Sequence, residues 1–127
     1  MAGERILLVE DNPMNRRVSE FLLKAQGYIV DEARDGQEAL EKVKMQLPDL
    51  ILMDVQLPGL DGFATTRIIK QDDATKTIPI VALTAYAMSG DAERALDAGC
   101  DGYITKPIDP DEFHKIVASY LKPASRK

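Results

Sequence analysis

Five short apolar runs, separated by segments with helical periodicity, constrain the fold of this chain more than any other feature. The runs span residues 5–9, 29–33, 50–54, 80–84 and 102–105. Apolar strands that alternate with helices are typical of a parallel sheet covered by helices on both faces. We therefore predict a doubly wound α/β sandwich of five βα units, in which a five-stranded parallel sheet has the order 2-1-3-4-5.

Four of these runs end on reactive polar residues. Glu10 and Asp11 follow the first run, Asp54 ends the third, Thr84 ends the fourth and Lys106 follows the fifth. In the predicted strand order the first and third strands are neighbours at the topological switch point, where open α/β sheets place their sites. We expect these side chains to meet at the carboxyl edge of the sheet.

The segments between the runs have apolar stripes and caps that predict helices. In the first helix the predicted inner face is Val18, Phe21, Leu22 and Ala25, and Gly27 ends the helix. Asp35 and Glu38 predict a reciprocal cap for the second, whose inner face would be Ala39, Leu40, Val43 and Leu47. The third is predicted from residue 61 or 62 to residue 72.

The last two predicted helices differ in the apolar area they offer. The fourth, over residues 89–98, would bury only Ala92, Ala95 and Leu96, so we expect it to be held loosely. The fifth begins at Asp109 and Pro110 and has an unbroken inner stripe of Phe113, Ile116, Val117, Tyr120 and Leu121.

Length and composition indicate one globular domain over residues 1–127, with residues 122–127 as a loose tail. The net charge of -5 opposes direct binding to nucleic acid. No apolar run approaches the roughly 20 residues needed to span a bilayer, so we expect no membrane insertion and a cytoplasmic location. The single cysteine, Cys100, suits a small buried side chain better than a reactive thiol.

The chemistry of the strand-end residues points to phosphate. Three neighbouring carboxylates repel one another by about 4 kcal/mol per pair at ~4 Å, so a cation must offset them. Oxygen ligands at an open cleft suit Mg²⁺, and Lys106 supplies a second positive charge. Together with the Thr84 hydroxyl they would receive a phosphoryl group, and Asp54, which ends the central strand, is the best candidate nucleophile.

Each of these residues also has an ordinary structural interpretation. Asp11 could cap the first helix, Asp54 could be a plain strand-end carboxylate, Thr84 a strand former and Lys106 a solvated surface charge. The functional interpretation is favoured because four separate strands place complementary groups at one edge.

Four motifs contain the strand-end residues: residues 9–12 (VEDN), 49–62 (DLILMDVQLPGLDG), 83–85 (LTA) and 103–107 (YITKP). With these motifs the chain resembles the receiver domain of bacterial two-component response regulators, which has a flavodoxin/CheY-like fold. The resemblance covers nearly the whole chain.

The resemblance implies a role for each residue of the motifs. Asp54 would accept a phosphoryl group from a histidine kinase or phosphotransfer protein. Asp11, Asp54 and the backbone carbonyl of Gln56 would hold Mg²⁺, with Glu10 acting mostly through water. Thr84, Ala85 and Lys106 would bind the phosphoryl group, and a cis bond between Lys106 and Pro107 would aim the lysine.

The resemblance also implies how the signal leaves the domain. Thr84 would move toward the phosphoryl group, and Tyr103 would rotate into the vacated space. This would repack the face made by the fourth helix, the fifth strand and the fifth helix, through which a downstream protein target is controlled. We expect no enzymatic activity beyond self-phosphorylation and self-dephosphorylation, and a monomer or a weak phosphorylation-dependent dimer.

Within the family, residues 25–28 (AQGY), 56–58 (QLP) and 84–91 (TAYAMSGD) look most like DivK-type single-domain regulators, which implies a role in cell-division or cell-cycle signalling. Receivers of hybrid histidine kinases are similar in the same stretches.

Three other functions stay open at this level. An aspartyl-phosphate phosphatase of the haloacid-dehalogenase type would need Asp-x-Asp where residues 10–12 read Glu-Asp-Asn. A flavodoxin-like carrier would need a hydroxyl-rich loop at residues 12–15. A receiver that binds partners without phosphorylation is disfavoured by the intact acceptor residues.

Overall fold

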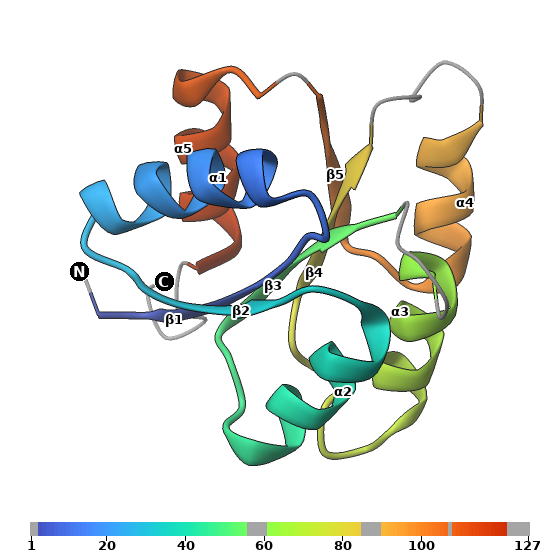
Figure 1. Ribbon diagram of the computed structural model, residues 1–127. Coiled ribbons are helices and arrows are strands. Elements are labelled where there is room, and N and C mark those ends of the chain that lie inside the picture. The colour runs from blue at the N-terminus through green and yellow to red at the C-terminus, as the bar shows by residue number, and fades with distance from the viewer. Residues whose placement is uncertain (1–2, 56–60, 85–89, 107, 122–127) are drawn as a thin grey trace.

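Strands and helices alternate along the whole chain in the computed structural model (Figure 1), which describes residues 3–55, 61–84, 90–106 and 108–121. The strands are β1 (Arg5–Val9), β2 (Ile29–Ala33), β3 (Leu50–Asp54), β4 (Ile80–Thr84) and β5 (Gly102–Thr105). The helices are α1 (Pro13–Ala25), α2 (Gly36–Met45), α3 (Gly62–Gln71), α4 (Asp91–Ala98) and α5 (Pro110–Leu121). The five predicted strands are confirmed at their predicted bounds.

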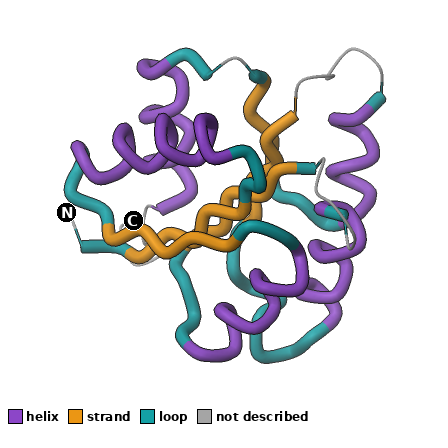
Figure 2. Tube along the Cα trace, viewed as in Figure 1, coloured by secondary structure: helices purple, strands orange, loops and turns teal. Residues whose placement is uncertain are grey.

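The strands form one parallel sheet of order β2-β1-β3-β4-β5, which confirms the predicted fold class. Figure 2 shows the sheet running through the centre with helices on either side. Helices α1 and α5 cover one face, and α2, α3 and α4 cover the other (Figure 1). The predicted domain span of residues 1–127 stays a prediction, and its tail, residues 122–127, lies outside the described residues.

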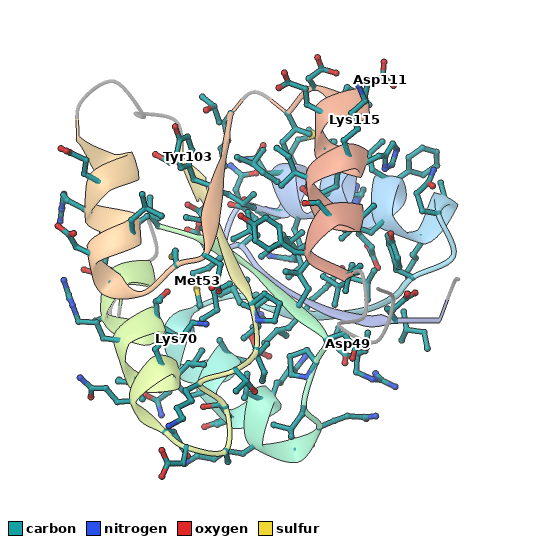
Figure 3. All side chains as sticks on the ribbon, turned by 180° about the vertical axis from the view of Figure 1, so that it is seen from behind. Asp49, Met53, Lys70, Tyr103, Asp111 and Lys115 are labelled. Atoms are coloured by element: carbon teal, nitrogen blue, oxygen red, sulfur yellow. The ribbon has the colours of Figure 1, made fainter. Side chains whose placement is uncertain are left out.

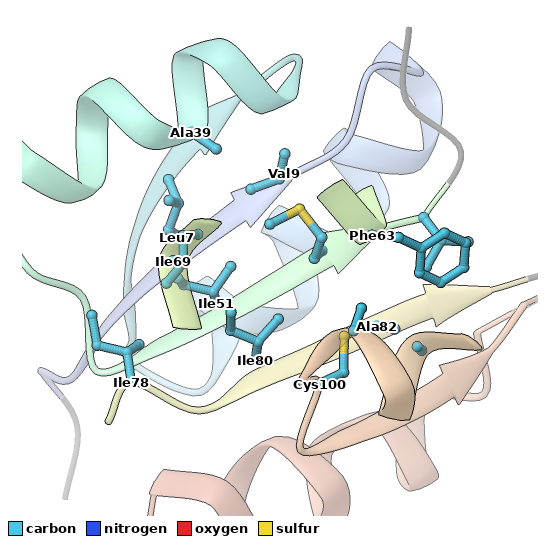
Figure 4. Packing of buried hydrophobic residues seen from close by; sticks show 14 of the residues in the cluster. Leu7, Val9, Ala39, Ile51, Phe63, Ile69, Ile78, Ile80, Ala82 and Cys100 are labelled. Atoms are coloured by element: carbon cyan, nitrogen blue, oxygen red, sulfur yellow. The ribbon is translucent and has the colours of Figure 1, made fainter. Parts of the chain in front are cut away.

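Successive residues of the central strands point to opposite faces and so build two cores. The core under α2, α3 and α4 holds Leu7, Val9, Ile51, Met53, Ile80 and Ala82 (Figure 4). The core under α1 and α5 holds Ile6, Leu8, Leu50, Leu52, Val81 and Leu83. Because β1, β3 and β4 are covered on both sides, their central residues are all apolar, and their carboxyl ends are fixed firmly.

Cys100 belongs to the first of these cores (Figure 4). Its sulfur lies 3.8 Å from Thr66 Oγ1. Burial raises the pKa of the Cys100 thiol, which disfavours the reactive thiolate. The interpretation as a small buried side chain is confirmed.

The predicted inner face of α1 is wrong. Ser19 and Leu23 are buried and Leu22 is partly buried, whereas Val18, Phe21 and Ala25 are exposed. The inner face is therefore rotated by about one residue from the predicted stripe. Both stripes have helical spacing, and the contact with α5 selects the one that contains Leu23.

The helix ends follow the predicted caps closely. Asp35 Oδ1 accepts a hydrogen bond from the Glu38 N–H at 2.8 Å, and Glu38 Oε1 accepts from the Arg34 N–H at 2.7 Å. The reciprocal bond thus reaches one residue further back than the capping box predicts. Helix α2 ends at Met45, so Leu47, predicted on its inner face, is exposed instead. Gly27 ends α1 with a φ of 89°, as predicted.

Helix α4 begins at Asp91, after its N-cap Gly90, and the predicted start at residue 89 lies outside the described residues. Ala95 and Ala98 are buried, but Leu96 is half exposed, so its predicted burial is wrong. In α5 the start at Asp109 is confirmed, since Asp109 Oδ1 accepts from the Asp111 N–H at 3.0 Å. Its predicted stripe faces the core, with Ile116 and Tyr120 only partly buried.

Among the described residues, no helix combines the length and the apolar character that crossing a membrane requires.

Candidate functional site

The predicted site residues lie at the carboxyl edge of the sheet, where backbone hydrogen bonds continue past the strand ends. The Glu10 N–H donates to the Ala33 carbonyl at 2.9 Å, which extends the pairing of β1 with β2. The Lys106 N–H donates to the Thr84 carbonyl at 2.8 Å, which extends the pairing of β5 with β4. The sheet therefore fixes the backbones from which Glu10 and Lys106 project.

Strand alternation explains why three of these side chains meet. Ile6, Leu8, Leu50, Leu52 and Ile104 face the core under α1 and α5. Glu10, Asp54 and Lys106 lie an even number of residues further along the same strands, so they are directed toward the same side. Thr84 has the opposite parity, since Ile80 and Ala82 face the other core.

Lys106 connects the two buried carboxylates of the site. Its Nζ atom lies 3.2 Å from Glu10 Oε1 and 3.1 Å from Asp54 Oδ2. Glu10 is only 1% exposed and Asp54 only 3%. Burial alone would lower the pKa of Lys106, but the charges and hydrogen bonds of Asp54 and Glu10 outweigh it and raise the pKa above its ordinary value. Lys106 is therefore a permanent cation between two acids.

The surroundings of Glu10 disfavour the ionised form of its carboxyl group. Burial is the largest cause that raises its pKa, from 4.5 to about 7, and the hydrogen bond and charge of Asp54 add to the shift. Lys106 opposes the shift without cancelling it. An added cation at this place would therefore stabilise the ionised form of Glu10.

The acidic side chains fit a hard metal ion. Carboxylate oxygens of Glu10, Asp11 and Asp54 lie within 4.8 Å of one another. Asp11 is exposed, so the group opens to solvent on that side. An all-oxygen donor set that is open to water suits Mg²⁺, which keeps part of its hydration shell in proteins.

Helix α1 is capped by Asn12, so capping does not explain Asp11. Asn12 Oδ1 accepts a hydrogen bond from the Asn15 N–H at 3.0 Å. The Asn12 N–H in turn donates to Glu10 Oε2 at 3.3 Å. The turn between β1 and α1 thus leaves the Asp11 carboxylate for another use, and the simple structural interpretation of this residue is wrong.

The predicted switch residues lie on neighbouring strands in register, with Thr84 of β4 opposite Thr105 of β5 and Ala82 opposite Tyr103. Thr84 is buried, whereas Tyr103 is 41% exposed. Figure 3 shows Tyr103 on β5 between the ribbons of α4 and α5. The structure thus places Tyr103 outward, and its rotation on phosphorylation stays a prediction.

Three predicted contributions fall on residues outside the described part of the chain. These are the Gln56 carbonyl as a metal ligand, Ala85 as a phosphate contact, and the cis bond between Lys106 and Pro107. They stay predictions.

The family model of the response regulator receiver domain matches residues 6–118. The chain belongs to this family. As a receiver, it is similar over 91% of its length to the polar-differentiation response regulator DivK of Brucella anthropi, at 44% identity over 94% of that protein.

Two solved structures show the same receiver fold. The receiver domain of the sensor histidine kinase PA1611 from Pseudomonas aeruginosa, which has a magnesium ion coordinated in its active-site cleft, is 43% identical. It matches with a TM-score of 0.89 over 94% of this chain and 98% of that one. The chemotaxis response regulator CheY4 of Vibrio cholerae is 28% identical, with a TM-score of 0.88 over 94% of this chain and 100% of that one.

The sequence did not predict every contact of this receiver site. Lys106 pairs with Glu10, 96 positions away, as well as with Asp54, 52 positions away, and no local pattern encodes the pair with Glu10. The Asn12 cap could have been found from its residue type, which ranks among the best helix caps. Arg16, which donates to the backbone of the β1–α1 turn, left no pattern of its own.

Proposed function

We propose that this receiver is a phosphoacceptor of a two-component phosphorelay, in which Asp54 takes a phosphoryl group from a histidine kinase or a histidine phosphotransfer protein. One observation carries the proposal above all others. Asp54 lies buried at the end of the central strand, paired with the Lys106 ammonium and grouped with two further carboxylates. A lone structural carboxylate needs none of these partners.

The residues are suited to the transfer from phosphohistidine. A carboxylate oxygen of Asp54 would attack the phosphorus, the P–N bond would break, and its electron pair would return to the imidazole of the donor. Lys106, which already contacts Asp54 Oδ2 at 3.1 Å, would neutralise charge on the phosphoryl oxygens. Thr84 and Ala85 would complete the phosphate contacts.

The donor set supports Mg²⁺ as the cofactor. Asp11, Asp54 and the Gln56 carbonyl would hold the ion, with Glu10 acting mostly through water. When bound, the ion would neutralise the acidic group and stabilise the charge that develops on the phosphoryl oxygens. The pKa of Glu10 is raised first by burial and then by the neighbouring Asp54, and a bound cation would oppose this shift.

The signal would leave through the face formed by α4, β5 and α5. Rearrangement of Thr84 on phosphorylation and inward rotation of the half-exposed Tyr103 would change this face and control a downstream protein. The protein would work in the cytoplasm as a monomer or a weak phosphorylation-dependent dimer. It would act on no substrate other than its own phosphoryl group.

Similarity to DivK supports a role in polar differentiation and cell-cycle signalling. The receiver of a hybrid histidine kinase is the second candidate, because PA1611 is the sensor histidine kinase whose receiver matches at 43% identity. Both alternatives use the same acceptor chemistry at Asp54.

The proposal is tested by intact mass after incubation with acetyl phosphate and Mg²⁺. We expect the mass of one phosphoryl group to be added to the parent and to Asp61→Asn, which keeps a capping side chain at α3, but not to Asp54→Asn. No gain in the parent, or an equal gain in Asp54→Asn, would refute it. Steady release of product from a small phosphate ester would favour the phosphatase instead.

A further inference from the structure

The side chain of Arg16 reaches from α1 back to the turn that carries the acidic pair. Its Nη1 atom donates to the Glu10 carbonyl at 2.8 Å and approaches the Asp11 carbonyl at 3.4 Å. The side chain is only 17% exposed. A guanidinium therefore binds the backbone of two of the three residues whose carboxylates form the candidate cation site.

The same guanidinium is also tied to the neighbouring strand. Arg16 Nε lies 3.5 Å from Glu32 Oε1, and Glu32 stands opposite Leu8 in the pairing of β2 with β1. Arg16 thus joins α1, β2 and the β1–α1 turn through one rigid planar group. Arg16 therefore fixes the turn both from α1 and from β2.

Backbone orientation in this turn decides where the carboxylates point. Glu10 and Asp11 are the only residues between the end of β1 and the cap Asn12. A change in the φ and ψ angles of this turn would redirect both Cα–Cβ bonds, because each bond direction is set by the N, Cα and C atoms of its own residue. Groups behind a metal ligand commonly hold it in its productive orientation.

We propose that Arg16 is a positioning residue, which aims the Glu10 and Asp11 carboxylates at the cation site by binding their backbone carbonyls. The inference rests on the proposed function, since it assigns Arg16 to the same Mg²⁺ site. Arg16 itself contacts neither the ion nor the phosphoryl group.

Charge and position predict opposite effects when Arg16 is removed. Arg16 is a cation close to a cation site, so simple electrostatics predicts that its loss makes Mg²⁺ bind more tightly. Loss of positioning predicts the reverse. The sign of the change therefore separates the two explanations without reference to its size.

The test is a calorimetric titration of the folded, metal-free proteins with Mg²⁺. For Arg16→Ala we expect the Mg²⁺ dissociation constant to rise by about tenfold, as for other groups that orient metal ligands. Arg17→Ala is the matched control, because Arg17 is the exposed neighbour on α1 and carries the same charge. It should stay within about twofold of the parent, and Arg16→Lys, which keeps a donor and the charge, should recover part of the affinity.

A purely structural role is tested by Glu32→Gln, which removes the ion pair but leaves Arg16 able to donate to the carbonyls. Glu32→Gln should keep the Mg²⁺ affinity of the parent, whatever its effect on stability in urea unfolding, whereas Arg16→Ala should lose Mg²⁺ affinity. Equal losses of affinity in the two variants, or tighter binding in Arg16→Ala, would overturn the inference.

The parent protein distinguishes this failure from a failure of the proposed function. If the parent neither binds Mg²⁺ nor gains phosphoryl mass from acetyl phosphate, the proposed function is wrong and the inference falls with it. If the parent does both and Arg16→Ala binds Mg²⁺ as tightly, only the role of Arg16 is refuted.

Discussion

Gly62 lies against the carbonyl group of Asp54 so closely that a side chain at position 62 would overlap it. A Cβ atom there would overlap the Asp54 carbonyl oxygen and lie 2.7 Å from the Cα atom of Val55. Both neighbours are backbone atoms of the strand end that holds the candidate phosphoacceptor. The missing side chain lets α3 begin directly against this strand end.

We predict that Gly62→Ala destabilises the protein by about 2 kcal/mol or more, because the backbone must shift to relieve the overlap. The shift would move Asp54, so the rate of phosphorylation by acetyl phosphate should also fall. Urea unfolding and intact mass measure the two effects. Gly90→Ala is the control: its Cβ would meet nothing within 4 Å, and only its φ of 93° carries a cost of about 1–2 kcal/mol.

Glu10 gives the metal-free protein a distinctive pH dependence. Its pKa is about 7 in the folded protein and near 4.5 when unfolded, so the folded state binds the extra proton between these values. The contribution of Glu10 to stability must therefore fall as the pH rises from about 4.5 to 7. Glu10→Gln removes this contribution.

We predict that Glu10→Gln is more stable than the parent by about 2 kcal/mol at pH 8 without Mg²⁺, and that the advantage disappears at pH 4.5. Urea unfolding at several pH values measures it, with the exposed Glu41→Gln as control. Saturating Mg²⁺ should reduce the advantage at pH 8. Parallel pH profiles for the parent and Glu10→Gln would contradict the prediction.

The sequence predicted the features of the fold that local pattern decides, but not those that packing between distant segments decides. Strand bounds were predicted fully, because β1, β3 and β4 are apolar on both faces and are bounded by polar residues. The predicted strand order placed Glu10, Asp54 and Lys106 at one edge of the sheet. It did not predict the ion pair of Lys106 with Glu10, which depends on packing between distant parts of the chain.

The inner face of α1 was not predictable in this way. A stripe of Val18, Phe21, Leu22 and Ala25 has helical spacing, and so does the stripe through Ser19 and Leu23 that is buried instead. Hydrophobicity favoured the first stripe, because Ser19 in the second is polar. In the described structure the Oγ atom of Ser19 is buried without a hydrogen-bond partner. Packing against α5 decided for the second, and that contact joins opposite ends of the chain.

The exposed apolar residues of α1 give a prediction about how a protein phosphodonor docks. Met14, Val18 and Phe21 form an exposed apolar row on α1, in which Phe21 is 72% exposed. A cavity of about 220 Å³, lined by Asn15, Val18, Lys106 and Ile108, joins this row to the site. An exposed apolar row beside a reactive group is suited to protein contact.

We predict that Val18→Asp slows phosphoryl transfer from a protein donor, such as a phosphorylated histidine phosphotransfer domain, by tenfold or more, as an interface substitution costing about 1.4 kcal/mol would. Transfer from acetyl phosphate should change by less than about twofold, because this small donor needs no docking surface. Leu96→Asp, on the exposed side of α4, is the matched control. Equal slowing with both donors would place the defect in the site rather than in docking.

On the face formed by α4, β5 and α5, a core residue and the predicted switch residue differ in exposure. Phe113 is fully buried among the residues under α1 and α5, whereas Tyr103 is half exposed on β5. We predict that Phe113→Ala costs about 3–5 kcal/mol of stability, which urea unfolding will measure. Tyr103→Ala should cost less than about 1 kcal/mol, since little apolar area is lost from the core.

We also predict that Tyr103→Ala leaves phosphorylation of Asp54 intact but abolishes the difference in partner binding between the phosphorylated and unphosphorylated forms. If Tyr103→Ala still binds its partner in a phosphorylation-dependent way, the signal leaves the site by another route.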